Sequence, residues 1–241
     1  MKIAVVSDIH GNSWALEKVL HDIKRRDAAL VLNLGDTFYG PLDPQGTLDL
    51  IRYWKIISVS GNEDRMILSN CSSDPTLEYV TRSLPDEALL WLSDLPTITF
   101  YGADMILFHG TPASDSEYLI ENPDAFGTHV RPAGEISMLI NGYKQRLIFC
   151  GHSHIQRTVV IGAQTIINPG SVGCPAFEDD FPAYHRIENF SNFARYCMVE
   201  WNDDKILVDQ IALQYDSEVA ARCAEKNNRP DWARWLKTGR V

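Results

Sequence analysis

Five apolar runs in the chain each end in side chains that can bind a metal ion. The side chains that follow the runs are Asp8 and His10, then Asp36, Asn62 and His109, and finally His152 and His154. Each run is too short for a helix and rich in Val, Ile and Leu, which indicates a buried strand. Ligands in open α/β sheets gather beyond the carboxyl ends of the strands, so we expect these side chains to share one site.

The ligand set indicates the kind of metal centre. Seven liganding side chains are too many for one tetrahedral ion and suit two metals that share a carboxylate. Asp36, at the end of the second run, is able to bridge two ions through its two oxygens. Carboxylate, amide and imidazole ligands without a thiolate favour manganese, iron or zinc over calcium or magnesium. The predicted cofactor is a pair of divalent ions, manganese first, with iron, zinc or nickel as alternatives.

Composition limits the class of protein and its partners. The 241 residues include 22 Lys and Arg and 32 Asp and Glu, a net charge of −10 that disfavours long nucleic acids but not a small phosphorylated substrate. No run approaches roughly 18 consecutive apolar residues, so no membrane partner is expected. The five cysteines form no CxxC pair, which indicates reduced thiols and a cytoplasmic location. A homo-oligomer stays open as an alternative.

The first third of the chain predicts a parallel sheet. Residues 2–7, 28–34 and 56–60 are the expected strands, with helices between them. The first helix has an apolar stripe, and Asn12 or Ser13 is its expected N-cap. This β-α-β-α-β order implies parallel strands with right-handed crossovers.

The rest of the chain predicts interrupted helices and antiparallel ribbons. Residues 64–95 are helical, with Pro75 and Pro85 in first turns, and residues 112–130 form a long loop. Further expected elements are a hairpin over 97–110, a helix over 132–143, strands over 146–150, 157–161, 164–168, 195–201 and 205–213, a turn over 202–204, and two C-terminal helices broken at Pro230. No linker or repeat appears, so we expect one domain, residues 1–241, in which helices cover two packed sheets.

With these ligand motifs the sequence resembles the calcineurin-like metallophosphoesterase superfamily. The motifs that carry the resemblance are DIH at 8–10, GD at 35–36, GN at 61–62, HG at 109–110, GHSH at 151–154 and NPGSVG at 168–173. GDTFYGP at 35–41 and HGTPASDSEYL at 109–119 are similar to the small bacterial phosphodiesterase or diadenosine tetraphosphatase-like branch. The resemblance implies an α/β (α+β) fold, a four-layer α/β/β/α sandwich of two mixed β-sheets flanked by helices.

The resemblance also implies an allocation of ligands. The first metal would take Asp8, His10, Asp36 and His154, and the second would take Asp36, Asn62, His109 and His152. The implied activity is hydrolysis of small phosphodiesters or dinucleoside polyphosphates by a metal-bridging hydroxide. Alternatives are a phosphomonoesterase or phosphoprotein phosphatase, and a catalytically silent metal-binding scaffold, which would lack ligands that this chain retains.

Glu63 departs from the family pattern. It follows the GN pair, where the family often has His to protonate the leaving oxygen. We predict a catalytic set of Asp36, Asn62, Glu63 and His109. Glu63 would be a weak general acid or a residue that orients a ligand or water, with a surface residue as the alternative. Because a carboxylate beside two cations is a poor acid, leaving groups that need no proton are expected, such as nucleotide phosphates or aryl oxides.

Other residues are candidates for supporting roles. Tyr39, Asn62, Arg65 and Ser171 are the predicted substrate contacts. Asp64 is expected either to accept a hydrogen bond from a ligand histidine or to cap the next helix. The remaining candidates are His129 and His185, placed in loops as substrate contacts, and Trp232 and Trp235, expected to dock the C-terminal tail or to form an oligomer interface.

Overall fold

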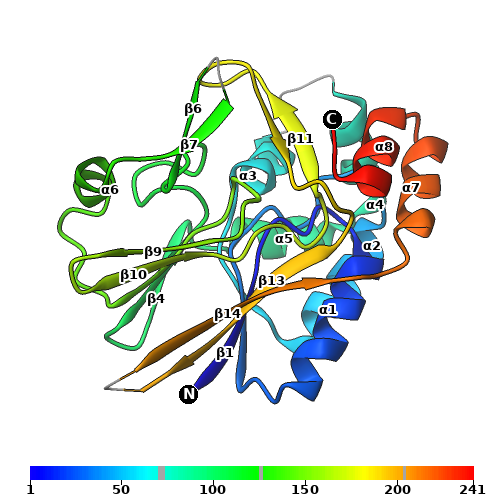
Figure 1. Ribbon diagram of the computed structural model, residues 1–241. Coiled ribbons are helices and arrows are strands. Elements are labelled where there is room, and N and C mark those ends of the chain that lie inside the picture. Colours follow the sequence, from blue (N-terminus) through cyan, green and yellow to red (C-terminus); the bar gives the residue numbers. More distant parts are fainter. Residues whose placement is uncertain (70–73, 125–126, 203–204) are drawn as a thin grey trace.

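The computed structural model describes residues 1–69, 74–124, 127–202 and 205–241. Two five-stranded sheets run through the described residues (Figure 1). The first sheet has the order β14–β13–β1–β2–β3. Its strands are β1 (Lys2–Val6), β2 (Leu30–Asn33), β3 (Ile57–Ser58), β13 (Ala194–Trp201) and β14 (Ile206–Leu213). Strands β1, β2 and β3 are parallel and β13 pairs antiparallel with β1, which confirms the predicted β-α-β-α-β unit.

The second sheet has the order β4–β5–β8–β10–β9. Its strands are β4 (Ile98–Tyr101), β5 (Met105–Phe108), β8 (Leu147–Phe149), β9 (Arg157–Ile161) and β10 (Gln164–Asn168). Strands β5, β8 and β10 are parallel neighbours, whereas β4 and β9 close the two edges as antiparallel hairpins. Both sheets are therefore mixed, and both predicted hairpins are confirmed.

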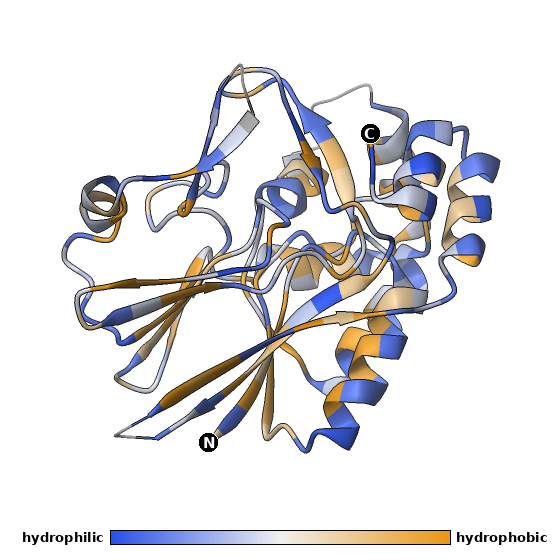
Figure 2. Cartoon of the chain, viewed as in Figure 1, coloured by the Kyte–Doolittle hydropathy of each residue, from blue (hydrophilic) through white to orange (hydrophobic). Residues whose placement is uncertain are grey.

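Helices cover the outer faces of the two sheets. The helices are α1 (Ser13–Arg25), α2 (Pro44–Trp54), α3 (Asn62–Ser69), α4 (Pro75–Ser83), α5 (Asp86–Ser93), α6 (Ala133–Leu139), α7 (Ser217–Lys226) and α8 (Pro230–Thr238). Asn12 caps α1 by accepting the N–H of Ala15 at 3.1 Å, as predicted. The apolar face of α1 turns toward the first sheet and its polar face lies outside (Figure 2).

Three apolar layers hold the architecture together. Leu16 and Leu20 of α1 pack on the first sheet, and Ile136 of α6 packs on the second. Between the sheets, residues such as Val5 and Phe149 are fully buried. Removing this surface from water is the main driving force for folding. The result is the predicted four-layer α/β/β/α sandwich, while the assignment of residues 1–241 to one domain stays a prediction.

Two short antiparallel ribbons were not predicted from the sequence. β6 (Glu121–Asp124) pairs with β7 (Gly127–Val130), and β11 (Ala176–Asp179) pairs with β12 (His185–Glu188). The prediction that residues 112–130 form only a loop was wrong, because backbone pairing builds the first ribbon from polar segments such as ENPD that show no apolar alternation. His129 and His185 accordingly lie in strands rather than loops.

Smaller details also differ from expectation. Pro75 lies in the first turn of α4 as predicted, but Pro85 precedes the first turn of α5 as its N-cap. Cys71 and residues 203–204 of the predicted turn lie outside the described residues. Within the described ranges, no helix combines the length and apolarity that a membrane crossing requires.

Candidate metal centre

The predicted ligands lie at the carboxyl ends of strands from both sheets. Asp8 and Asp36 follow β1 and β2 of the first sheet, and His109 and His152 follow β5 and β8 of the second. The apolar layer between the sheets holds these four strand ends together. All seven predicted ligands are buried or half-buried, which separates the cluster from bulk water.

The backbone at the ligand positions is unusual. Among the described residues, nine non-glycine residues have a positive φ, and five of them are predicted ligands: Asp8 at 54°, His10 at 52°, Asp36 at 53°, His152 at 68° and His154 at 56°. This left-handed conformation costs a side-chain-bearing residue about 1–2 kcal/mol. Strain of this kind concentrates at functional sites, where the surrounding structure enforces it.

Asp36 belongs to two groups of potential ligands. In one group it lies with Asp8 and His10, and in the other with His109 and His152, with the donor atoms of each group within 4.8 Å of one another. His109 Nε2 is 3.1 Å from Asp36 Oδ2 and 3.8 Å from Asp8 Oδ1. The shared carboxylate thus lies between two sets of imidazole and carboxylate donors.

Three imidazoles present the nitrogen that a metal would bind. The Nδ1 atoms of His10, His109 and His154 lie 2.9, 2.8 and 2.8 Å from the backbone oxygens of Tyr39, Leu34 and Cys174. A carbonyl oxygen only accepts, so in the neutral imidazole, the state that binds a metal, Nδ1 carries the proton and Nε2 has the lone pair. Backbone carbonyls therefore fix both the tautomer and the orientation of each ring.

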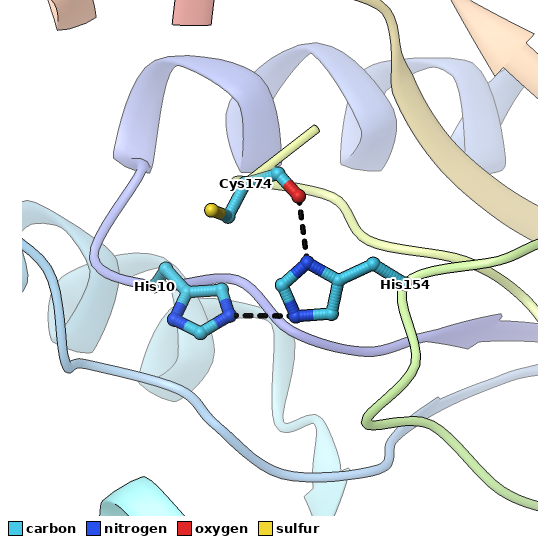
Figure 3. Close-up of side chains that lie close together, drawn as sticks. All are labelled: His10, His154 and Cys174. Atoms are coloured by element: carbon cyan, nitrogen blue, oxygen red, sulfur yellow. Dashed lines mark hydrogen bonds between the residues drawn. The ribbon is translucent and has the colours of Figure 1, made fainter. Parts of the chain in front are cut away.

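His10 and His154 then face one another with two acceptor atoms. Their Nε2 atoms are 3.1 Å apart (Figure 3). His154 Nε2 is also 3.3 Å from Asp8 Oδ1. Two lone pairs at this distance repel unless a proton or a cation joins them. The buried atoms without a hydrogen-bond partner include three from the predicted ligands, namely Asp8 Oδ1, Asn62 Oδ1 and His109 Nε2. A divalent cation would satisfy all of these atoms, so the residues fit a metal centre.

The charges of the site follow from the same contacts. Burial lowers the pKa of His109, but the nearby Asp36 and Asp8 carboxylates outweigh it and raise the pKa to about 10. Burial raises the pKa of Asp36, and His109 outweighs it, so this pKa falls below its usual range. Burial and the neighbouring His109 lower the pKa of His152 to about 3, which keeps its imidazole neutral, the state that binds a metal.

Asp64 holds the loop that carries Asp36. Its carboxylate accepts the backbone N–H groups of Asp36 at 2.8 Å, Thr37 at 3.0 Å and Gly61 at 3.0 Å. Gly61 directly precedes α3, so this last bond satisfies a free N–H at the helix start. The partners of Asp64 are thus backbone groups, which agrees with the expected capping role and not with the alternative of a ligand imidazole. Burial, together with Asp36, raises the pKa of Asp64 to about 7.

Gly61 explains why the GN motif begins with glycine. A Cβ at this position would lie 2.1 Å from Asp36 Oδ1 and 2.6 Å from the Asp36 nitrogen. No real Cβ atom approaches that closely, so any other residue would displace the shared carboxylate. The N–H of Glu63 donates to the same Oδ1 at 2.9 Å. The start of α3 therefore cradles Asp36.

Glu63 reaches His10. One of its oxygens is 3.0 Å from His10 Nδ1, and its backbone lies at the first turn of α3. Burial raises the pKa of Glu63 to about 7, although His10 opposes this shift. In turn, burial lowers the pKa of His10, but Glu63 outweighs it and raises the pKa to about 9. The contact allows Glu63 to orient an imidazole of the site, which is one of the roles considered for it, and Glu63 is not a fully exposed surface residue.

The predicted substrate contacts occupy three different environments. Tyr39 lines the cavity beside the cluster, and its hydroxyl donates to Asp74. Arg65 forms a two-pronged ion pair with Asp115 at 2.7 and 2.8 Å on the exposed side of α3. Ser171 is buried, donates to the Asp8 oxygen at 2.8 Å and accepts the Cys174 N–H at 2.8 Å. These contacts favour structural roles for Arg65 and Ser171, whereas Tyr39 can meet a substrate.

His129 and His185, the two other candidate histidines, belong to none of the ligand groups among the described residues. His185 is buried and shares hydrogen bonds with the Tyr118 hydroxyl and the Ala183 oxygen. His129 is exposed, with Nε2 3.5 Å from Asp124. His129 therefore has a partner within its own ribbon, whereas His185 contacts Tyr118, whose ring lies 4.7 Å from that of the ligand His152.

Several cavity residues escaped the sequence analysis. A cavity of about 260 Å³ opens beside His10, Asp36, Asn62 and Glu63. Its other walls include Cys174, Phe177, Glu178, Asp179, Arg229, Trp232 and Trp235. These residues come from β11, the segment before it and α8, and no spacing in the sequence connects them with the ligand motifs. Trp232 and Trp235 do dock the C-terminal tail, and both also line this cavity.

The comparison with protein families decides the family. A model of the calcineurin-like phosphoesterase superfamily domain matches residues 1–190. The chain belongs to this superfamily. The resemblance predicted from the motifs is confirmed, and this calcineurin-like phosphoesterase is a metal-dependent phosphoester hydrolase by family.

Relatives of this phosphoesterase share its whole length. The uncharacterized protein MJ0912 of Methanocaldococcus jannaschii is 31% identical over 257 residues, covering 95% of this chain and 94% of the relative. A metallophosphoesterase from Sphaerobacter thermophilus aligns with a TM-score of 0.77 and 24% identity over 99% of each chain. The protein PH1004 of Pyrococcus horikoshii OT3 aligns with a TM-score of 0.76 and 18% identity over 99% of this chain and 98% of its own. A candidate diadenosine tetraphosphatase aligns with a TM-score of 0.54 and 19% identity over 87% of this chain and 93% of its own. These structures share the fold.

Proposed function

We propose that this phosphoesterase binds two divalent cations around Asp36 and hydrolyses small phosphodiesters or dinucleoside polyphosphates. The observation that carries the proposal is the membership of Asp36 in two ligand groups, one with Asp8 and His10 and one with His109 and His152. A site for one ion would need only one such group. The shared carboxylate supports a dinuclear centre.

Each ion would have its own set of donors. Asp8, His10 and His154 would hold one cation and Asn62, His109 and His152 the other, with Asp36 in both sets. When bound, such a pair lowers the pKa of coordinated water and stabilises charge on the phosphoryl oxygens. The side chains carry −2 from Asp8 and Asp36, so the loaded site would be positive and attract a phosphate despite the net charge of −10.

The surrounding residues keep the donors in place. Carbonyl oxygens fix three imidazoles, Asp64 fixes the loop of Asp36, and Glu63 approaches His10. Such a prepared site loses little energy to rearrangement when charge develops on the substrate. Asn62 Oδ1 is buried without a partner at the start of α3, where the helix also favours an anion.

The cavity favours a small diester. Its volume of about 260 Å³ falls below the ~300–1,000 Å³ typical of pockets for drug-sized ligands, which favours small substrates over phosphoproteins. Glu63, Glu178 and Asp179 place carboxylates on its walls. A phosphomonoester carries one more negative charge on its phosphorus than a diester does, so these carboxylates disfavour it.

The donor chemistry favours manganese. Oxygen and imidazole donors predominate in both groups, and the nearby Cys174 thiol donates to the Ala176 oxygen at 3.1 Å. Burial raises the pKa of this thiol well above its usual value, so it stays protonated. Without a thiolate, the set suits manganese, with iron, zinc or nickel as alternatives.

A substrate panel with manganese tests the proposal. The panel contains bis-(p-nitrophenyl) phosphate, p-nitrophenyl phosphate, a cyclic nucleotide, diadenosine tetraphosphate and a phosphopeptide. Turnover of the diester or the dinucleotide, with negligible monoester turnover and about two bound ions per chain, is the expected result. Monoester turnover alone would instead identify a phosphomonoesterase, and full metal content without turnover would identify a silent scaffold.

A further inference from the structure

The C-terminal helix builds an aromatic wall beside the metal centre. Trp232 of α8 lies with its ring 5.8 Å from the His10 ring at an interplanar angle of 71°. Phe177 of β11 packs against the same apolar cluster as Trp232, and its ring lies 4.5 Å from that of His154. Helix α8 packs against β11, as Figure 1 also shows, although it lies beyond residues 1–190 that carry the superfamily domain. The wall is therefore a feature of this chain in addition to the metal-ligand motifs.

One polar atom of this wall has no partner. Trp235 lines the cavity and is 5% exposed, and within the described residues its Nε1–H finds no hydrogen-bond acceptor. A buried donor without an acceptor is costly and rare in folded proteins. An acceptor atom of a bound ligand would remove that cost.

Charged side chains lie beside the aromatic wall. Arg229 stacks over the Trp232 ring at 5.7 Å, and Asp231 accepts from the same guanidinium at 2.7 Å. Glu178 and Asp179 of β11 also line the cavity. One oxygen of Glu178 accepts from the Tyr184 hydroxyl at 2.8 Å and one oxygen of Asp179 from the Phe181 N–H at 2.9 Å, so the second oxygen of each can accept from a ligand N–H group. The walls thus offer flat aromatic surface, one buried donor and peripheral acceptors.

We propose that the part of the cavity lined by Phe177 of β11 and by Trp232 and Trp235 of α8 is a subsite for a nucleobase attached to the phosphate that the metal centre hydrolyses. A base would lie against the aromatic wall, its ring nitrogen or carbonyl oxygen would accept from Trp235, and an amino group would donate to Glu178 or Asp179. An alkyl group would fill the space but leave the Trp235 N–H without an acceptor. The inference rests on the proposed function for its placement of the phosphate, and it names the substrate class as nucleotide esters.

Binding of a nucleotide without turnover tests the subsite directly. We would titrate adenosine 5′-monophosphate and ribose 5-phosphate into the full chain by calorimetry, both manganese-loaded and after chelation. The nucleotide should bind at least about tenfold more tightly, because stacking of one base is worth that much. Equal affinities for the two ligands would overturn the proposal.

Matched variants locate the binding. Trp235→Phe keeps the aromatic ring and removes only the N–H, so nucleotide affinity should fall about fivefold. Trp201→Phe is its control, because Trp201 Nε1 is also buried without a partner among the described residues but does not line this cavity. Phe177→Leu removes a stacking face and should lower affinity about tenfold. Equal losses in Trp235→Phe and Trp201→Phe would overturn the placement.

Kinetics separate this subsite from the proposed chemistry. Thymidine 5′-monophosphate p-nitrophenyl ester and methyl p-nitrophenyl phosphate have the same leaving group, and only the first carries a base. The nucleoside ester should have a KM about tenfold lower than the methyl ester, and Phe177→Leu should abolish this ratio between the two KM values. Equal KM values for two hydrolysed esters would refute the subsite alone. Hydrolysis of neither ester would refute the proposed function, and the calorimetric comparison would still decide the subsite.

Discussion

The carboxylate of Asp64 accepts the backbone N–H of Asp36 at 2.8 Å, although the two residues follow different strands. The same carboxylate also accepts from Thr37 and Gly61. One buried side chain therefore fixes the loop that carries the shared aspartate and the start of α3, which carries Asn62. The metal-binding geometry depends on this residue even though it is outside the predicted ligand set.

Replacing Asp64 should weaken both the fold and the site. Asp64→Ala leaves three backbone N–H groups unpaired, so the free energy of unfolding should fall by about 2–4 kcal/mol. Asp64→Asn keeps one acceptor oxygen and should lose less. Urea unfolding measures both, and Glu17→Ala on the exposed face of α1 should stay within about 0.5 kcal/mol of wild type. A stable Asp64→Ala variant with full metal content would contradict this role.

Asp36 should control the content of both metal positions. Asp36→Asn removes the charge that two groups of donors share, so the variant should retain less than about one ion per chain after dialysis. Asp8→Asn alters a residue of only one group and should retain about one ion. Elemental analysis of the purified variants decides the matter, and two retained ions in Asp36→Asn would rule out the shared role.

Glu63 should matter little for activated esters. Its carboxylate lies 3.0 Å from His10 Nδ1, an orienting contact, and an aryl oxide leaves without needing a proton. Glu63→Gln should therefore change kcat on bis-(p-nitrophenyl) phosphate by less than about tenfold at saturating manganese. A general acid contributes about 10²–10⁴-fold, so a thousandfold loss on this ester would show that Glu63 takes part in the chemistry.

Cys174 should remain a protonated neighbour of the metal centre. Its sulfur lies within 4.8 Å of donor nitrogens of His10 and His154, yet it donates a hydrogen bond to Ala176. Cobalt-loaded protein should lack a near-ultraviolet sulfur-to-cobalt charge-transfer band, and Cys174→Ser should bind as much manganese as wild type. A band that disappears in Cys174→Ser would identify a thiolate ligand and shift the preference toward zinc or iron.

Asp22 should make stability depend on pH in the acid range. Burial raises the pKa of its carboxyl group, but hydrogen bonds from Tyr196, Arg26 and Arg25 outweigh it and lower the pKa from 3.8 to about 2. A depressed pKa contributes stability that is complete above pH ~4 and is lost as pH falls toward 2. Asp22→Asn should cost about 1–3 kcal/mol at pH 7 and much less near pH 2.

The control for this prediction lies on the same segment of chain. Asp27 is exposed and has a positive φ of 60°, which asparagine also tolerates. Asp27→Asn should unfold like wild type across this pH range. If the difference between wild type and Asp22→Asn stayed constant from pH 7 to pH 2, the Asp22 carboxylate would have no part in the acid dependence.

The sequence alone was sufficient for the elements that position the ligands. Strands such as β1 and β5 are apolar throughout because they are buried on both faces, and each is followed directly by a polar donor such as Asp8 or His109. Signals of this kind are local, so they survive without a structure. The positive φ values of the ligands and the position of Asp36 within two ligand groups depend on the three-dimensional structure, so the sequence does not give them.

What the sequence did not reveal depends on contacts between distant segments. β6 and β11 contain polar residues in pairing positions, so their pattern does not differ from that of a loop. Trp232 reaches His10 only because α8 packs against β11, a contact set by tertiary packing rather than by spacing. The cavity wall could therefore not be predicted from the sequence, although Trp232 and Trp235 were predicted to dock the C-terminal tail or to form an oligomer interface.

The two ligand groups also join the halves of the molecule. Asp36 follows a strand of the first sheet, whereas His109 and His152 follow strands of the second. A cation bound by all three side chains would therefore cross-link the two sheets. Ligands that bind only the folded chain stabilise it by mass action. Chelation should accordingly speed hydrogen exchange in β1 and β8 together, because the sheets would then be free to slide across the apolar layer between them.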